Sequence, residues 1–557
     1  MISLFFAQKY DRKYLEVLPV GVYLFMLLSY LLAVTGHVSH ITGLLMMYEL
    51  AGLGLVIFMT RLKKAALLKP LADPGNLIFV LLLIILRLLS LHMRVTNFDD
   101  FHSWAITPKD MYFVNGMPTG NMASTFYRDY FPLVYIMDFL FFKLSGGFSE
   151  SGMFFVLWVL MTVSMSVFFH RREDDDNIRY ICRVSAGIML PFLVSFQFLH
   201  CLGLDILATV IFGSVLVYIM EEVEGGKPGD GQTGFVYLRI ILATSVLAMM
   251  KTTSIVLAAV CIGVYFVRRI EPGKLLSWVY CILYPVITGG FWMSWKVFCR
   301  IKGNTTYLSE NLDRNLTSGH MGFPSYTGST VKEFFIKLFT YGLNDGAAGL
   351  TSVIILLIFV FSYIIYKRRK GPDIRSTLSF VTVIAGMAGY LLVMIYIYLF
   401  VFEEWEALTL SSYDRYIATY FGAMLFVALY FLLVEEIRPV WAVPALMLML
   451  AVTLNYPFIM KTLSPAGFDR EFGETVREID SISDEFFKAA GEQPAYGEKI
   501  VIVDPSQDQL RAKVLPYAAV PGVTRLIRPD ADGNVPSESE IAETAEEYGA
   551  RVIDLRR

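Results

Sequence analysis

Apolar stretches long enough to cross a bilayer recur along the chain up to about residue 460. Of the 557 residues, 55% are hydrophobic and only 17% are charged. A water-soluble core could not bury so much apolar surface, and a helix needs roughly 20 apolar residues to span the hydrocarbon layer. We therefore expect an α-helical polytopic membrane protein. Thirteen spans are predicted, at 15–34, 39–60, 75–92, 153–169, 181–198, 202–220, 236–250, 253–268, 275–297, 347–366, 376–402, 416–434 and 440–458.

The basic connections between these spans predict their orientation, because lysine and arginine concentrate in the cytoplasmic loops of membrane proteins. Four connections are rich in them: 61–69, 170–183, 268–274 and 367–375. We expect these connections and the N-terminus in the cytoplasm, with the protein in the cell membrane. Three long stretches would then lie outside, at 93–152, 298–346 and 403–415.

A short apolar run at 131–144 does not fit this alternation as a crossing. Only one crossing can lie between the outer loop after residue 92 and the cytoplasmic connection at 170–183, and the span 153–169 provides it. The short run also contains Asp138 and Lys143. We therefore expect it to form a helix in the outer membrane interface. Thirteen crossings then leave the C-terminus outside.

The composition changes near residue 460, where the apolar runs end. The string EKIVIVD predicts a buried strand, SESEIAETAEEYGA an amphipathic helix and ARVIDL a further short strand. We expect two domains: a transmembrane domain over 1–459 and a small extracytoplasmic α/β domain over 460–557.

Charge and cysteine content exclude several kinds of partner. The net charge is −3, so no nucleic-acid partner is expected. The five cysteines form neither a CxxC motif nor a cluster with histidine, so neither a disulfide framework nor a zinc site is predicted. Outer carboxylates would permit a divalent metal, but no metal or other cofactor is predicted; they are Glu403, Glu404, Glu406 and Asp414.

The first outer loop carries the strongest candidate for a functional site. It begins NFDDFHSWAITPKD, with Asp99 and Asp100 directly after a membrane span. Carboxylates beside lipid are costly unless they are paired or hydrated in a cavity. The alternative is that the two acids cap the helix that follows them. Because adjacent residues do not share a helix face, we expect the two acids to have different roles, and the sequence does not assign them.

Two cations near the outer ends of later spans complete the candidate site. Lys251 lies in MMKTTS, where two spans meet, and Arg415 lies in SSYDRY, at the start of another. Arginine grips a phosphate as a fork and lysine as a point charge. A single lysine at such a position, like Lys251, more commonly just extends its ammonium group to water. Beside the acid pair, the cations favour an anionic substrate from the headgroup plane.

The string DDFHSWAITPK resembles the DEFSHW…K signature of the GT-C superfamily of membrane glycosyltransferases, in particular its bacterial cell-envelope members. The corresponding residues are Asp99, Asp100, Phe101, Trp104 and Lys109, with Asp in place of Glu at 100 and the His–Ser order reversed at 102 and 103.

Further likenesses follow in the expected order along the chain. The family's Tyr-Pro-Pro-Gly helix start is represented only by Tyr130 and Pro132. KTTS (251–254) is similar to its lysine-threonine-glycine hairpin, and SYDRY (412–416) to its arginine turn. The layout of spans and C-terminal outer domain is similar to that of aminoarabinose transferases and protein O-mannosyltransferases.

The resemblance implies an inverting transfer of a sugar from a polyprenyl-phosphate donor to a hydroxyl of a cell-envelope glycan or glycolipid. Lys251 and Arg415 would bind the donor phosphate, and one carboxylate would be the base. In the family the first acid is usually described as the base, which favours Asp99 over Asp100. Monophosphate-donor relatives generally work without a metal.

Three further residues of the outer loop are expected on the substrate side of this site. They are His102, Lys109 and Arg128, and His102 is also a rival candidate for the base.

Two other classes of function remain open from the sequence. A transporter or flippase would use ionisable residues inside the spans, where Glu49 and Asp205 lie. A non-catalytic scaffold of envelope assembly would act mainly through the C-terminal domain.

Overall fold

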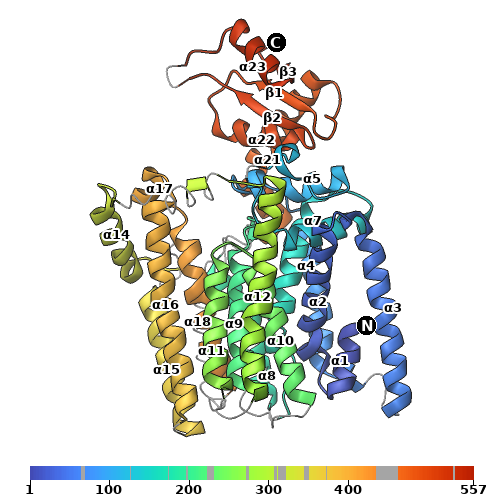
Figure 1. Ribbon diagram of the computed structural model, residues 1–557, viewed down its shortest axis with the longest axis vertical. Helices are drawn as coiled ribbons and strands as arrows, with labels where there is room; N and C mark the ends of the chain where they lie inside the picture. The colour runs from blue at the N-terminus through green and yellow to red at the C-terminus, as the bar shows by residue number, and fades with distance from the viewer. Residues whose placement is uncertain are drawn as a thin grey trace.

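The computed structural model describes most of the chain, and Figure 1 shows a bundle of helices that carries a small α/β domain at one end. The residues described are 1–63, 69–125, 127–173, 175–195, 199–222, 231–270, 275–306, 310–311, 322–343, 350–371, 373–434, 462–530 and 533–556. The predicted span 440–458 lies outside them.

Each of the other predicted spans overlaps one long helix of the bundle. These helices are α2 (Tyr14–Val34), α3 (Ile41–Lys63), α4 (Pro74–Ser90), α7 (Glu150–Ser164), α8 (Asn177–Val194), α9 (Asp205–Glu222), α10 (Gly231–Ala248), α11 (Ser254–Arg269), α12 (Leu275–Lys302), α15 (Ser352–Lys370), α16 (Ile374–Phe400) and α18 (Tyr413–Val434). Shorter helices join or flank them: α1 (Ile2–Tyr10), α5 (Ile106–Val114), α6 (Leu133–Ser145), α14 (Thr327–Thr340) and α17 (Glu404–Thr409).

The apolar helices indicate a multi-pass membrane protein. Among the described residues, six helices have the length and hydropathy to cross a membrane. They are α2, the segment Val38–Arg61 that contains α3, α8, α12, α16 and α18. Several of them expose large apolar side chains, such as Met47 and Leu50 on α3 and Ile282 on α12. Such surfaces are favourable against lipid and costly in water.

Two glycines let α9 and α18 approach closely at the centre of the bundle. A Cβ on Gly422 would lie 2.6 Å from Val194 Cγ1 and 2.8 Å from Thr209 Cγ2, and one on Gly213 would lie 2.6 Å from Phe426 Cγ. Small residues at such crossings allow tight packing between membrane helices. This packing fixes the first residues of α9 and α18 beside each other.

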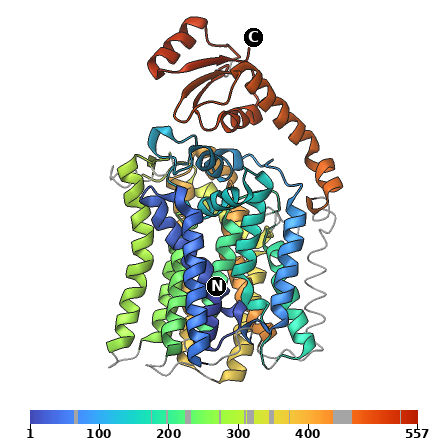
Figure 2. The same ribbon diagram turned by 90° about the vertical axis from the view of Figure 1, so that its right-hand side faces the viewer.

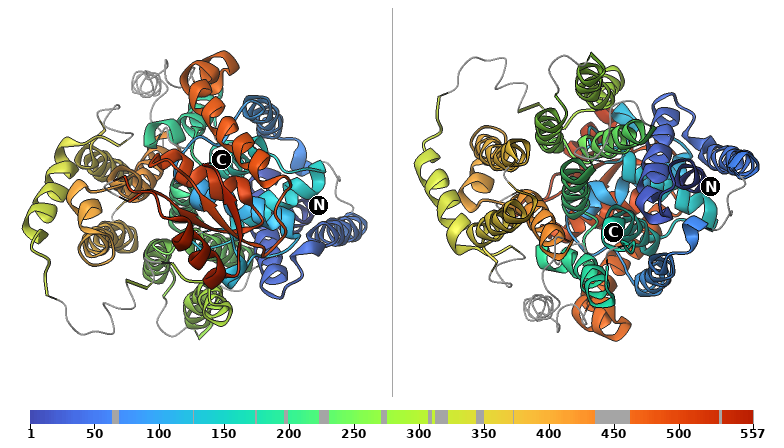
Figure 3. Two further views of the ribbon diagram at one scale, coloured as in Figure 1. Left: turned by 90° about the horizontal axis from the view of Figure 1, so that it is seen from above. Right: turned by 90° about the horizontal axis from the view of Figure 1, so that it is seen from below.

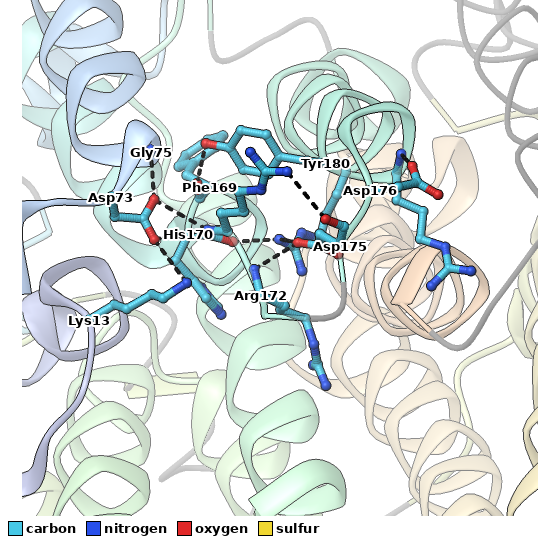
Figure 4. Close-up of polar contacts among 12 residues, drawn as sticks. Lys13, Asp73, Gly75, Phe169, His170, Arg172, Asp175, Asp176 and Tyr180 are labelled. Carbon is cyan, nitrogen blue, oxygen red and sulfur yellow. Dashed lines mark hydrogen bonds and ion pairs between the residues drawn. The ribbon is translucent and has the colours of Figure 1, made fainter.

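A polar cluster holds the connection before α8 (Figure 4). Asp73 accepts the Gly75 N–H at 2.7 Å and so caps α4, and it also pairs with Lys13 Nζ at 3.2 Å. The fully buried Arg183 pairs with Asp175. These contacts compensate the charges of the basic connection where it meets the bundle.

The cluster and the acidic loop lie at opposite ends of α18. Arg172, next to the cluster, donates to the hydroxyl of Tyr430, near the end of α18, at 3.2 Å. Arg415, near the start of α18, contacts Asp99. Fifteen residues of helix, at about 1.5 Å each, separate these two positions by roughly 22 Å.

The apolar run at 131–144 forms α6, as the sequence predicts, but its surroundings differ from the prediction. Nine of its 13 residues are buried, including Asp138, and the helix packs against α2, α5 and α7. It ends at Gly146, whose φ of 78° suits glycine. The helix is therefore surrounded mainly by other helices of the protein, whereas we expected it to lie in the membrane interface.

The C-terminal part contains the predicted strands and helix together with elements that were not predicted. It consists of α21 (Pro465–Ala490), β1 (Lys499–Val503), α22 (Gln509–Ala519), β2 (Val523–Ile527), α23 (Glu538–Tyr548) and β3 (Arg551–Asp554). The strands form a parallel sheet in the order β2-β1-β3. The central strand is apolar on both faces because helices cover both of them. In Figure 2, α21 leads obliquely from the bundle to this sheet.

Candidate functional site

Asp99 and Asp100 introduce a π-helical turn at the domain-bearing end of the bundle. The turn spans Asp100–Trp104 and is closed by the Ala105 N–H, which donates to the Asp100 carbonyl at 2.8 Å. The Asp99 side chain occupies the position before the turn but makes no capping hydrogen bond, and Asp100 accepts from another segment. The capping alternative is therefore wrong for both acids.

Asp99 is the accessible member of the pair. Its side chain is 48% exposed, and Oδ2 lies 2.6 Å from Nη1 of Arg415, near the start of α18. A short contact between a guanidinium and a carboxylate is a strong, charge-assisted hydrogen bond. Asp99 is thus held in place on one side and open to solvent on the other.

Asp100 has the opposite surroundings. It is completely buried, and both of its oxygens lie 3.1 Å from the Leu202 N–H. Burial raises the pKa of Asp100 well above its ordinary value, which favours the neutral acid. Its geometry suits a structural contact that ties the acidic loop to the segment before α9. The two acids therefore differ in their surroundings, as expected for adjacent residues.

A buried ion-pair network lies directly beside Asp99. Asp205, the first residue of α9, accepts from Arg415 Nη2 at 3.1 Å and Nε at 3.2 Å, and it pairs with Lys251 through its other oxygen. The three side chains are only 13–14% exposed. Lys251 is thus not the lone cation that the sequence suggested. Its partner was considered only as a transporter residue, because Asp205 lies 46 positions away in the chain.

The charges of this network cancel. Asp99 and Asp205 contribute two negative charges, and Arg415 and Lys251 contribute two positive ones. An anion that arrives at Arg415 must therefore share it with a carboxylate. The more exposed of the two carboxylates is Asp99, so it is the one that an incoming anion would displace.

A pocket opens at the buried side of Arg415. It is a small cavity of about 20 Å³ between α8, α9 and α18. Most of the lining is apolar or small, and Asp205 and Arg415 provide its charged end; the other lining residues are Val194, Ser195, Cys201, Gly203, Ile206, Thr209 and Ala418. A cavity of this volume holds about one water molecule.

The other predicted substrate residues lie elsewhere in the loop. Lys109 lies at the contact with the C-terminal domain, where its Nζ donates to the Tyr517 carbonyl of α22 at 2.8 Å and lies 3.9 Å from the centre of the Tyr517 ring. Burial lowers the pKa of Lys109 to about 8. Arg128 is half-buried and its Nε donates to the Thr125 carbonyl at 3.3 Å. The Nδ1 of His102 lies 3.2 Å from Nζ of Lys513.

The structure therefore brings Asp99, Asp100, Lys251 and Arg415 to one place and leaves Lys109 at the contact between the two parts of the chain. Two of the four carboxylates that could have suggested a metal have a structural role, because Glu403 and Glu406 form the capping box of α17. Among the described residues, no group of three His, Cys, Asp or Glu side chains is arranged to hold a metal ion.

Asp110 gives a prediction about pH. It is buried beside the C-terminal domain, where Oδ2 accepts the Ser124 N–H at 2.9 Å and burial raises its pKa to about 7. The folded protein then binds this proton more tightly than the unfolded chain, whose pKa is near 3.8. Stability should fall as the pH rises from 4 to 7, by up to about 4 kcal/mol at ~1.4 kcal/mol per pKa unit.

Thermal unfolding of the full chain against pH checks this prediction. The stability of the Asp110→Asn variant should no longer decrease between pH 4 and 7. The Asp484→Asn variant, changed at an exposed position on α21, should show the same decrease as the wild type. Equal pH profiles for all three proteins would show that Asp110 does not titrate as its burial implies.

The fold and the site together define a mostly helical, multi-pass membrane protein with a charged network at the end that carries the α/β domain. Comparison of the sequence with protein-family models gives no match, and comparison with curated protein sequences gives none either. A function for the chain has to come from the chemistry of the site.

Proposed function

We propose that the chain is an inverting membrane glycosyltransferase of the GT-C kind. In this proposal it moves a sugar from a polyprenyl phosphate to a hydroxyl of a cell-envelope glycan or glycolipid. One observation carries the proposal: a half-exposed carboxylate, Asp99, is hydrogen-bonded to Arg415 at the charged end of an apolar pocket. The proposed base and the proposed phosphate-binding cations are thereby adjacent.

The reaction that fits this arrangement is a single displacement. The acceptor hydroxyl loses its proton to Asp99 as its oxygen forms a bond to the anomeric carbon. The bond from that carbon to the phosphate oxygen breaks, and the polyprenyl phosphate leaves with the bonding electrons. Arg415 and Lys251 stabilise the charge that develops on the leaving group, which is often the largest contribution to such catalysis.

Donor binding would also activate the base. Because Asp99 shares Arg415 with Asp205, a donor phosphate at Arg415 takes over the hydrogen bond that holds Asp99. The released carboxylate is then more available to a proton. Asp100 maintains the shape of the site through Leu202 and does not face the acceptor.

The proposal includes a membrane topology. Thirteen crossings, counting 440–458, place the N-terminus in the cytoplasm and the acidic loop and C-terminal domain outside. In support, Arg172 of a basic connection contacts one end of α18 and Asp99 contacts the other. Lysine and arginine favour the cytoplasmic side.

The contacts of Glu49 and Asp205 argue against the transporter alternative. Glu49 pairs with the amine of Met1 at 2.7 Å, and Asp205 begins α9 within the network at the end of the bundle. Neither is an isolated charge at mid-membrane, where transport residues typically lie.

A transfer assay in membranes separates the three classes of function. Asp99→Asn should abolish sugar transfer, and Glu49→Gln should leave it within about threefold, since partly exposed ion pairs contribute little. Greatest sensitivity at Glu49 would favour a transporter. Loss of function only on deletion after residue 460 would favour a scaffold.

A further inference from the structure

The C-terminal domain sits directly on the acidic loop. Its helix α22 contacts the turn at 100–104, and seen from above the domain lies over the central helices (Figure 3). The Tyr517 hydroxyl donates to Glu150 at 2.8 Å, and the Tyr517 ring lies 5.1 Å from that of Phe101. With the bond from Lys109 to the Tyr517 carbonyl, these contacts fix α22 over the site.

One turn before Tyr517, α22 directs Lys513 toward the site. Its Nζ lies 3.2 Å from His102 Nδ1 and 4.5 Å from the centre of the Phe98 ring. An ammonium group can only donate hydrogen bonds, so Nδ1 must be the acceptor and the imidazole proton is on Nε2. His102 is therefore assigned as a neutral imidazole that accepts from Lys513.

The charge of Lys513 is not balanced by a close acid. In the part of the chain that the structure describes, no ion pair joins a carboxylate to its Nζ within 4.0 Å. Burial lowers the pKa of Lys513, Asp99 is near enough to raise it, and Arg528 lowers it further. The network on the bundle side of Asp99 is neutral, as shown above. Lys513 thus adds one uncompensated positive charge on the side of Asp99 that faces the C-terminal domain.

We propose that Lys513 binds an anionic group on the acceptor, so that the C-terminal domain forms half of the acceptor site. The substrate class is a sugar that carries a phosphate or carboxylate close to the attacking hydroxyl. This inference rests on the proposed glycosyl transfer. Asp99 lies between two cations with separate tasks: Arg415 binds the donor phosphate, and Lys513 orients the acceptor.

Lys513 is a specificity residue in this scheme and takes no proton. The half-buried ammonium of Lys513 is the charged donor of the site, and His102 helps to hold it in place through Nδ1. An acceptor without the anionic group leaves Lys513 unpaired, and the site discriminates against it. The hydroxyl that reacts is then brought to the open side of Asp99.

Binding of defined sugars to the full-length protein in phosphatidylcholine nanodiscs tests the inference. The probes are glucose 6-phosphate, glucuronate and neutral glucose, and the readout is the dissociation constant from calorimetry. The variants are Lys513→Met, Lys513→Arg and Lys488→Met, the last at an exposed position of α21. Their thermal unfolding is compared with that of the wild type.

We expect Lys513→Met to weaken the binding of an anionic sugar roughly 10- to 100-fold, because this is what the loss of a hydrogen bond to a charged group typically costs. Lys513→Arg should restore most of the affinity, and Lys488→Met should not differ from the wild type. Preference for glucose 6-phosphate or for glucuronate identifies the anionic group. Glucose should bind equally weakly to every variant.

Two results would overturn the inference: wild-type protein that binds neither anionic sugar, or Lys513→Met protein that binds them as the wild type does. The failure of the proposed function looks different. In that case Asp99→Asn leaves transfer intact, whatever Lys513 binds. Transfer that depends on Asp99, together with unchanged sugar binding in Lys513→Met, would reject the role of Lys513 alone.

Discussion

Asp99→Asn is expected to lower sugar transfer by a factor of about 10²–10⁴, the usual contribution of a general base. The amide has nearly the same shape and can still accept a hydrogen bond from Arg415, but it cannot take a proton from the acceptor. Because the Asp99 side chain is 48% exposed, losing its charge beside Arg415 should cost little stability. The loss should therefore appear in the rate and not in folding.

The rate of transfer and the thermal unfolding of the same preparation are measured together. Asp484→Asn, which removes an exposed carboxylate from α21, is the matched control and should behave as the wild type. Asp100→Asn distinguishes the roles of the two acids. Because burial favours the neutral form of Asp100, replacing it by an amide should reduce transfer less than the same change at the base Asp99. Full transfer by Asp99→Asn would mean that the base lies elsewhere.

Asp205→Asn is expected to give the largest loss of stability. Asp205 compensates both Lys251 and Arg415 at a site where all three side chains are 13–14% exposed. Removing one partner of a buried ion pair typically costs about 3–5 kcal/mol, because the remaining charge stays buried without compensation. The free energy of unfolding in detergent should fall by an amount of this order.

An exposed ion pair of the same chain is the control. Asp11 and Lys69 pair at 3.2 Å with side chains 82% and 71% exposed, and Asp11→Asn should change stability by less than about 1 kcal/mol. The double variant Asp205→Asn with Lys251→Met should recover part of the loss, since one unpaired charge is gone. Equal effects of Asp205→Asn and Asp11→Asn would contradict a buried network.

The sequence predicts the helical bundle well because the signal for each helix is local. A run of apolar residues between polar ends is visible without any neighbour, and the described helices follow those runs. The strands Lys499–Val503 and Arg551–Asp554 were predicted for the same reason. The strand Val523–Ile527 was missed because Thr524 and Arg525 interrupt its apolar pattern.

The functional site could be predicted only in part, because its decisive contacts are not local. The motif around Asp99 is contiguous and drew attention by itself. Asp205 joins Arg415 across 210 positions, and Lys513 meets His102 across 411. No periodicity connects residues so far apart, so Lys251 was expected to be unpaired and Lys109 to bind substrate.

The lipids that copurify with the protein test the central claim most directly. Asp99→Asn should keep its donor because it cannot complete the transfer, while the cations that bind the phosphate are unchanged. Mass spectrometry of lipids extracted from this variant should reveal a polyprenyl phosphate that carries one sugar, enriched over the Arg415→Met variant. Only bulk phospholipids, in equal amounts with both variants, would contradict the assignment of the site to a lipid-phosphate sugar.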